Sequence, residues 1–189
     1  MIKYTNILLA ITGIIALVSC EIHSSDNGNL DNWWYLRQVE NINGNDNLNP
    51  NLNPNVEDYV DKKVFWGFIG KLMQTQGGGA GTYLYRFEQS GGKLRVYEPH
   101  KNNSKSSETS EEGEKTSVKI DPLVEAKDLY KLEVHGLHMK EKKDADGNPV
   151  YDSDGNVIYE ETFTIEQLTS ERMVLLNEDK TQRLYFLAW

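Results

Sequence analysis

The sequence predicts an all-β fold in which antiparallel strands close into a sandwich or a barrel. Three observations support this prediction. No long stretch shows the 3.6-residue periodicity of an amphipathic helix. Short runs rich in aromatic and β-branched residues recur along the chain, bounded by Gly, Asn, Asp and Ser. Several of these runs are separated by short connectors of the hairpin kind. Many short strands with little helix are typical of a sandwich or a barrel.

Eight segments show the strand pattern. They are residues 33–39, 63–74, 82–89, 93–98, 131–137, 157–168, 172–177 and 182–188. The short connectors 77–81, 90–92 and 177–180 predict antiparallel neighbours. One short helix is predicted at 121–130, with Pro122 in its first turn. Pairing of the last strand with the first would remove the exposed edges of the sheet.

Two long insertions interrupt this pattern. In residues 41–55 asparagine occupies every odd position, a composition that cannot bury apolar surface. We interpret this segment as low-complexity filler, the alternative being a flap over one end of a barrel. Residues 101–115 are charged and rich in serine, and we expect them to form a solvated loop.

The N-terminal segment has the pattern of a secretory signal. Lys3 precedes an apolar run at 7–18, which is shorter than the roughly 20 residues that a membrane span needs. We therefore expect residues 1–19 to be a signal peptide. The only cysteine of the chain, Cys20, follows directly.

The residues Leu17-Val-Ser-Cys20 resemble the lipobox of bacterial lipoproteins. The resemblance implies cleavage before Cys20 and attachment of lipid to this cysteine, with two or more acyl chains anchoring the protein stably. Residues 20–29 would then be the lipidated cysteine and a flexible tether, and 30–189 the folded domain. The alternative is a secreted protein with a free thiol. With Cys20 modified, the mature chain has no thiol left for an intrachain disulfide.

Four further stretches resemble the lipocalin-like lipoproteins of Gram-negative gut bacteria. They lie at 30–36, 64–74, 83–96 and 162–177. The spacing Asn32-x-Trp34 falls where lipocalins often carry Gly-x-Trp near the closed end of the barrel. The resemblance implies an antiparallel lipocalin-like β-barrel of about eight strands and a location at the outer membrane of a Gram-negative cell. It includes no catalytic motif, and a fold alone does not define a function.

Charge and motifs exclude several kinds of chemistry. The formal net charge of −9 argues against binding to nucleic acid and against binding of the protein surface to anionic lipids. We therefore expect the lipid attached to Cys20, rather than the protein surface, to contact the membrane. There is no Gly-x-Ser-x-Gly motif for a nucleophilic serine. The 29 acidic residues offer many carboxylate pairs for glycoside hydrolysis, yet no spacing selects one. We therefore predict a protein that is not an enzyme, with no catalytic residues and no cofactor.

Metal binding finds little support either. On the strand predicted at 131–137, Glu133 and His135 share a face, a weak candidate for a metal or acid–base pair, whereas His138 points away from His135. In and just after the tandem repeat at 144–159, Asp152, Asp154, Gly155 and Glu161 match positions 3, 5, 6 and 12 of a calcium loop, but Val150 stands at its first ligand position. The Asp-Gly pairs of the repeat favour a hairpin instead. We predict no metal site.

The candidate ligand site is a set of inward-facing aromatic residues. It consists of Trp66, Phe68, Tyr83, Tyr85 and Phe87. Because side chains alternate between the two faces of a strand, these residues would lie on the same face of neighbouring strands. A barrel of about eight strands has room inside for one small ligand. The alternative is that the rings pack together, with Trp34, as a dry core. We expect a membrane-anchored protein that binds a small apolar or amphiphilic ligand; the alternative is a structural or protein-interaction module at the outer membrane, whose protein partner the sequence does not identify.

Overall fold

The computed structural model describes residues 27–42, 56–102 and 123–189. The elements in chain order are the 3₁₀ turn η1 (Gly28–Leu30), the strands β1 (Trp33–Asn41), β2 (Val56–Asp58), β3 (Phe65–Ile69), β4 (Leu72–Gln76), β5 (Thr82–Ser90) and β6 (Lys93–Lys101), the 3₁₀ helix η2 (Ala126–His135), and the strands β7 (Lys140–Glu141), β8 (Tyr159–Leu168), β9 (Arg172–Asn177) and β10 (Gln182–Ala188).

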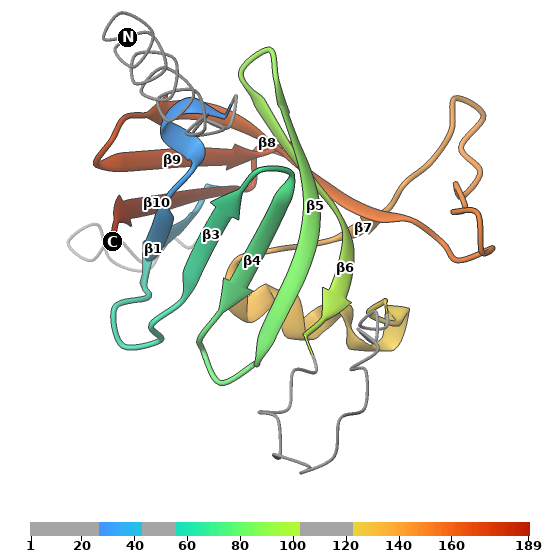
Figure 1. Cartoon of the computed structure of the whole chain (residues 1–189), viewed down its shortest axis with the longest axis horizontal. Helices are drawn as coiled ribbons and strands as arrows, with labels where there is room; N and C mark the ends of the chain where they lie inside the picture. Colours follow the sequence, from blue (N-terminus) through green and yellow to red (C-terminus); the bar gives the residue numbers. More distant parts are fainter. Residues whose placement is uncertain (1–26, 43–55, 103–122) are drawn as a thin grey trace, which may run out of the picture.

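Eight of these strands form a closed antiparallel barrel (Figure 1). Around the barrel, hydrogen-bonded neighbours follow the order β1, β3, β4, β5, β6, β8, β9 and β10. β10 then pairs with β1, from Trp34 opposite Ala188 to Asn41 opposite Gln182. The short strands β2 and β7 add to β1 and β8 outside this ring. The predicted barrel of about eight strands, closed by its first and last strands, is confirmed.

Two of the predicted elements are wrong. The strand predicted at 63–74 is the hairpin β3–β4, because Gly70 has a φ of 58° and turns the chain. The strand predicted at 131–137 is the second half of η2, which lies at 126–135 rather than at 121–130. Residues 131–137 alternate in polarity as a strand does, but their apolar side chains reach the core from a helix.

The repeat forms an arm that projects away from the barrel (Figure 1). Each repeat makes its own tight turn, closed by the bridges Lys143 to Pro149 and Tyr151 to Val157. The predicted hairpin is thus two small hairpins in series. The base of the arm is held by three backbone hydrogen bonds among residues spaced by eight. The N–H of Lys142 donates to the Ile158 carbonyl, that of Ile158 to the Val150 carbonyl, and that of Val150 to the Lys142 carbonyl.

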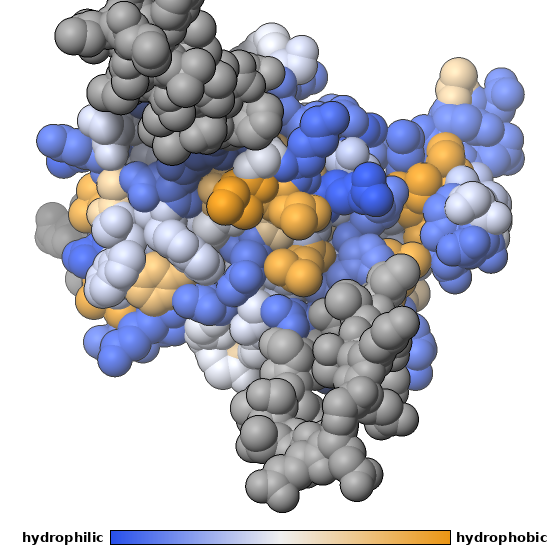
Figure 2. Space-filling model, viewed as in Figure 1, coloured by the Kyte–Doolittle hydropathy of each residue, from blue (hydrophilic) through white to orange (hydrophobic). Residues whose placement is uncertain are grey.

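The surface seen in Figure 2 is largely hydrophilic, with apolar side chains gathered over β3, β4 and β5. The large exposed apolar residues of the β3–β4 hairpin are Ile69 and Leu72. The side-chain amide of Asn27 donates to the carbonyl of Gly70, so the chain enters the barrel beside this turn. Among the described residues, no helix is long and apolar enough to cross a membrane.

Candidate functional site

The five residues predicted to bind ligand all lie inside the barrel and are buried there. The ring of Trp66 packs against the rings of Phe68, Phe163 and Phe186, with centroid distances of 6.4, 5.8 and 4.8 Å. Phe68 and Phe87 meet edge to face at 5.1 Å. Offset and edge-to-face contacts of this kind stabilise a core. The structure therefore brings these residues together in packed contact; their binding role stays a prediction.

Buried polar groups at one end of the interior form a single directed chain of hydrogen bonds. The Nε2–H of His135 donates to the Gly77 carbonyl at 3.1 Å, which leaves Nδ1 to accept from the Thr75 hydroxyl at 2.7 Å. The Tyr85 hydroxyl then donates to Thr75 Oγ1 at 3.2 Å. Burial lowers the pKa of His135, so the imidazole is held neutral. Each member of the chain is satisfied, which a buried polar network requires.

Helix η2 holds His135 in this position and closes the mouth of the barrel. It lies across the end where the β4–β5 loop is found (Figure 1). The indole N–H of Trp66 donates to the His135 carbonyl at 2.9 Å, and Leu132 and Leu137 are fully buried. The opposite end is closed by η1, where Trp34 donates to the Leu30 carbonyl at 3.0 Å. Both ends of the barrel are therefore filled by the chain itself.

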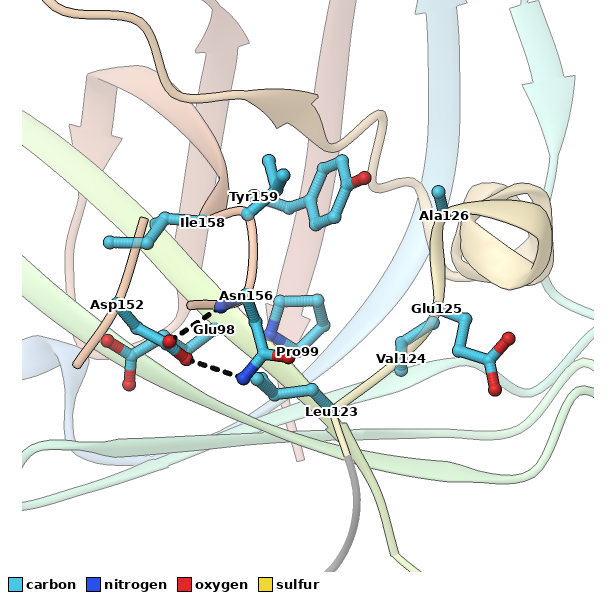
Figure 3. A pocket seen from close by; sticks show the side chains of 11 residues that line it. Glu98, Pro99, Leu123, Val124, Glu125, Ala126, Asp152, Asn156, Ile158 and Tyr159 are labelled. Carbon is cyan, nitrogen blue, oxygen red and sulfur yellow. Dashed lines mark hydrogen bonds between the residues drawn. The ribbon is translucent and has the colours of Figure 1, made fainter. Parts of the chain in front are cut away.

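A cavity of about 260 Å³ lies beside the closed mouth. Three segments distant in sequence form it: the end of β6, the residues leading into η2, and the second repeat of the arm (Figure 3). Its apolar lining consists of Pro99, Leu123, Val124, Ala126, Val157, Ile158 and Tyr159. Ligand pockets are mostly apolar with few polar groups, and the volume of this cavity is slightly below their usual range.

The polar groups of this cavity are acidic. Its lining contains Glu98, Glu125, Asp152 and Asn156, and no lysine, arginine or histidine. The Asp152 carboxylate is occupied within its own turn: it accepts from the backbone N–H groups of Asp154 and Asn156 and from the Asn156 side chain. In Figure 3 this pair lies on one side of the cavity and Glu125 on the other. These carboxylates disfavour an anionic ligand and suit a neutral or cationic one.

The other residues singled out in the sequence have different surroundings from those expected. Glu133 and His135 do not face each other, because both are on η2; Glu133 Oε1 instead lies 4.0 Å from Nδ1 of His138. Cys20 lies outside the described residues. Within the described ranges, no group of three or more His, Cys, Asp or Glu side chains is arranged to hold a metal ion.

Sequence patterns did not reveal the cavity beside the mouth. The segments 98–99, 123–126 and 152–159 are brought together only by the fold. The single local signal was the tandem repeat, which predicted turns but not the surface against which the second turn would pack.

A closed eight-stranded antiparallel barrel, with its first and last strands paired, is the architecture of lipocalin-like proteins, among other classes of β-barrel. Residues 15–188 match the family model described as a lipocalin-like domain, and the chain belongs to this family. Among solved structures, it is similar to a lipocalin-like protein from Bacteroides uniformis, with 16% identity and a TM-score of 0.46 over 86% of this chain and 100% of that one. No curated protein matches the chain.

Proposed function

We propose that this protein is a non-catalytic binding protein that holds a small apolar ligand in the cavity beside the barrel mouth. One observation supports this most directly: the cavity has a mainly apolar lining, and the residues that form it include no serine, threonine, cysteine, lysine or histidine. The packed interior contributes rigidity rather than space. Because the polar groups of the cavity are acidic, we expect the ligand to be neutral or cationic. Of the apolar or amphiphilic ligands expected from the sequence, this disfavours those with an anionic head group.

We further propose that Cys20 carries the lipid anchor and that the protein acts in the envelope of a Gram-negative cell, at the outer membrane. The supporting observations are the lipobox-like residues before Cys20 and the place where the described chain begins. Asn27, seven residues after Cys20, contacts the β3–β4 turn at the end of the barrel remote from the mouth. An anchor at that end would leave the cavity directed away from the membrane.

The tandem repeat supplies a matched pair of variants for the binding proposal. Tyr151 and Tyr159 occupy the same position in the two repeats, but only Tyr159 lines the cavity, while Tyr151 is 57% exposed on the arm. The neutral fluorophore N-phenyl-1-naphthylamine serves as the ligand in a titration followed by emission. We expect Tyr159→Ala to weaken binding about tenfold, equivalent to roughly 1.4 kcal/mol. Tyr151→Ala should bind as the unmodified protein does; equal binding by all three proteins would contradict the proposal.

The alternative function, a structural or protein-interaction module, is favoured by a different observation. The barrel is filled and the arm projects into solvent with most of its side chains exposed. Deletion of residues 144–157 removes both turns of the arm. Loss of a co-purifying protein from native membranes after this deletion, together with unchanged fluorophore binding by Tyr159→Ala, would support the alternative.

A further inference from the structure

A second hollow lies on the outer wall of the barrel and is distinct from the cavity beside the mouth. It has a volume of about 360 Å³ and extends across β1, β10, β9 and the end of β8, with Asp58 and Val60 above it. The base of the hollow is a row of cross-strand partners: Gln38 pairs with Tyr185, Tyr185 with Val174, and Val174 with Gln167. Its volume is within the usual range for small-molecule sites.

Two irregularities of the barrel supply residues to this hollow. The register between β1 and β10 shifts between Leu36 and Gln38, and that between β8 and β9 shifts between Ile165 and Gln167. A bulge re-aims side chains and is often found next to a functional site. Here Arg37 and Gln38 both line the hollow, as does Gln167. A regular β1 would have placed Arg37 and Gln38 on opposite faces of the sheet.

The segment above the hollow is held in place by three hydrogen bonds. The Tyr59 N–H donates to the Arg37 carbonyl at 2.9 Å, and the Val60 N–H donates to the Asp58 carboxylate at 2.8 Å. The Tyr35 hydroxyl donates to the Val60 carbonyl. The hollow is therefore formed before any ligand binds, which lowers the entropic cost of binding.

The charged residues that line the hollow are mostly basic, whereas the whole chain is acidic. Arg37 and Arg172 both line it, and the structure gives neither an ion pair among the residues it describes. The other barrel arginines, Arg86, Arg95 and Arg183, each pair with a carboxylate at 3.0 Å or less. The lining of the hollow thus contains two arginines and one acidic residue, Asp58, in a chain whose formal net charge is −9. The Arg37 guanidinium lies over the Tyr35 ring, 5.3 Å from its centroid.

Two neighbouring acidic groups are held by the same arginine, which leaves one net negative charge on this trio beside the hollow. Glu40 and Glu166 both accept from the Arg183 guanidinium, at 2.8 and 2.6 Å. The Tyr185 hydroxyl donates to Glu40 at 2.7 Å, so Tyr185 offers the hollow its ring rather than a donor. The apolar part of the lining includes Val60, Val174 and Leu187, and Gln38 and Gln167 add uncharged polar side chains.

We propose that this hollow binds a small anionic amphiphile, with its carboxylate or phosphate head on Arg37 and Arg172 and its apolar chain on Val60, Val174 and Leu187. Guanidinium groups bind such heads through paired N–H donors, and the adjacent apolar side chains bind the chain. This hollow favours an anionic ligand, whereas the cavity beside the mouth favours a neutral or cationic one, so the two sites accept different ligands.

Binding of octanoate, octyl phosphate and octylamine to the whole mature protein, measured by NMR titration, tests this proposal. We expect both anions to shift resonances of residues around Arg37 and Arg172, and octylamine to leave them unchanged. A preference between octanoate and octyl phosphate identifies the head group. Arg37→Gln with Arg172→Gln should weaken binding of the anions at least tenfold.

Two control variants show whether a loss of anion binding is specific to this hollow. Arg86→Gln removes a guanidinium from the opposite wall and should leave anion binding unchanged. Tyr159→Ala should also leave it unchanged, so failure of the mouth cavity and failure of this hollow are distinguishable. Binding of octylamine at the same residues, or anion binding that survives the double substitution, would overturn the proposal.

Discussion

At the scale of single residues, Glu161 is the carboxyl group whose pKa burial raises most among the described parts of the chain. It lies on β8 with 8% of its surface exposed and accepts from the His138 backbone N–H. Burial raises its pKa from the usual 4.5 to about 8. The folded protein thus keeps this proton to about pH 8, whereas the unfolded chain loses it near pH 4.5. The contribution of Glu161 to stability is therefore complete below pH 4.5 and is lost as the pH rises to about 8.

The variant Glu161→Gln should remove this pH dependence. Each pH unit within that window costs the unmodified protein roughly 1.4 kcal/mol of unfolding free energy, so the variant should be several kcal/mol more stable at pH 8. Urea unfolding between pH 4 and pH 9 measures the effect. Glu160→Gln, on the outward face beside Arg95, provides the control and should keep the original profile. Parallel profiles for the unmodified protein and Glu161→Gln would contradict the assignment.

Tyr85 tests whether the barrel interior is packed. Its side chain is buried and its hydroxyl donates only to Thr75. We expect Tyr85→Ala to lower the unfolding free energy by about 3–5 kcal/mol, as in other large-to-small aromatic substitutions. Tyr85→Phe keeps the ring and should cost only about 1 kcal/mol for the lost hydrogen bond. Thermal unfolding of both variants decides the question: a small effect of Tyr85→Ala would show an open interior and support the predicted pocket.

At the scale of elements, the end of η2 depends on one glycine. Gly136 has a φ of 78°, which lets the chain turn from the helix into the barrel. A Cβ added there would lie 2.8 Å from Leu184 Cδ2 and 3.3 Å from Leu36 Cδ2. The close approach to the core, as well as the backbone conformation, therefore requires glycine at this position.

Gly136→Ala should destabilise the protein more than the same substitution at a comparable exposed turn. Gly92 in the β5–β6 turn has a φ of 75° and nothing within 4 Å of its added Cβ, so Gly92→Ala reports the backbone strain alone, about 1–2 kcal/mol. We expect a further loss for Gly136→Ala because Leu184 must move. Chemical unfolding of the two variants measures the difference. Equal losses would show that η2 is not fitted tightly into the mouth.

At the scale of the whole molecule, the number of strands in the barrel was predicted correctly, although two elements were wrong and the short strands β2 and β7 were not predicted. The predicted strand 63–74 became two strands, and the predicted strand 131–137 became helix. Local patterns did not show either change: the turn at Gly70 lies in a run with apolar residues on both faces, and Leu132 and His135 are buried only because the mouth of a barrel surrounds them. Strands with clear alternation, such as β5, were found almost to the residue.

The candidate sites were less predictable than the fold, for a related reason. The aromatic residues Trp66, Tyr83 and Tyr85 were recognised as inward-facing from alternation, but alternation does not say whether a space remains between them. The hollow around Arg37 depends on two bulges. The alternation breaks at both, with two polar residues in a row at 37–38 and 166–167, but this break does not show which strands pair beside it. Long-range register, rather than composition, determines both sites.

The attachment of the whole molecule to the membrane gives the last prediction. If lipid on Cys20 is the anchor, Cys20→Ala should shift the protein from the membrane fraction into uncleaved precursor or soluble material. The exposed Ile69 and Leu72, beside the point where the chain enters the barrel, provide the matched control. Two or more acyl chains anchor a protein stably by themselves, so Ile69→Ser with Leu72→Ser should remain in the membrane fraction. Detergent-phase partitioning of both variants measures this, and a Cys20→Ala protein that is still processed and membrane-bound would refute the lipid anchor.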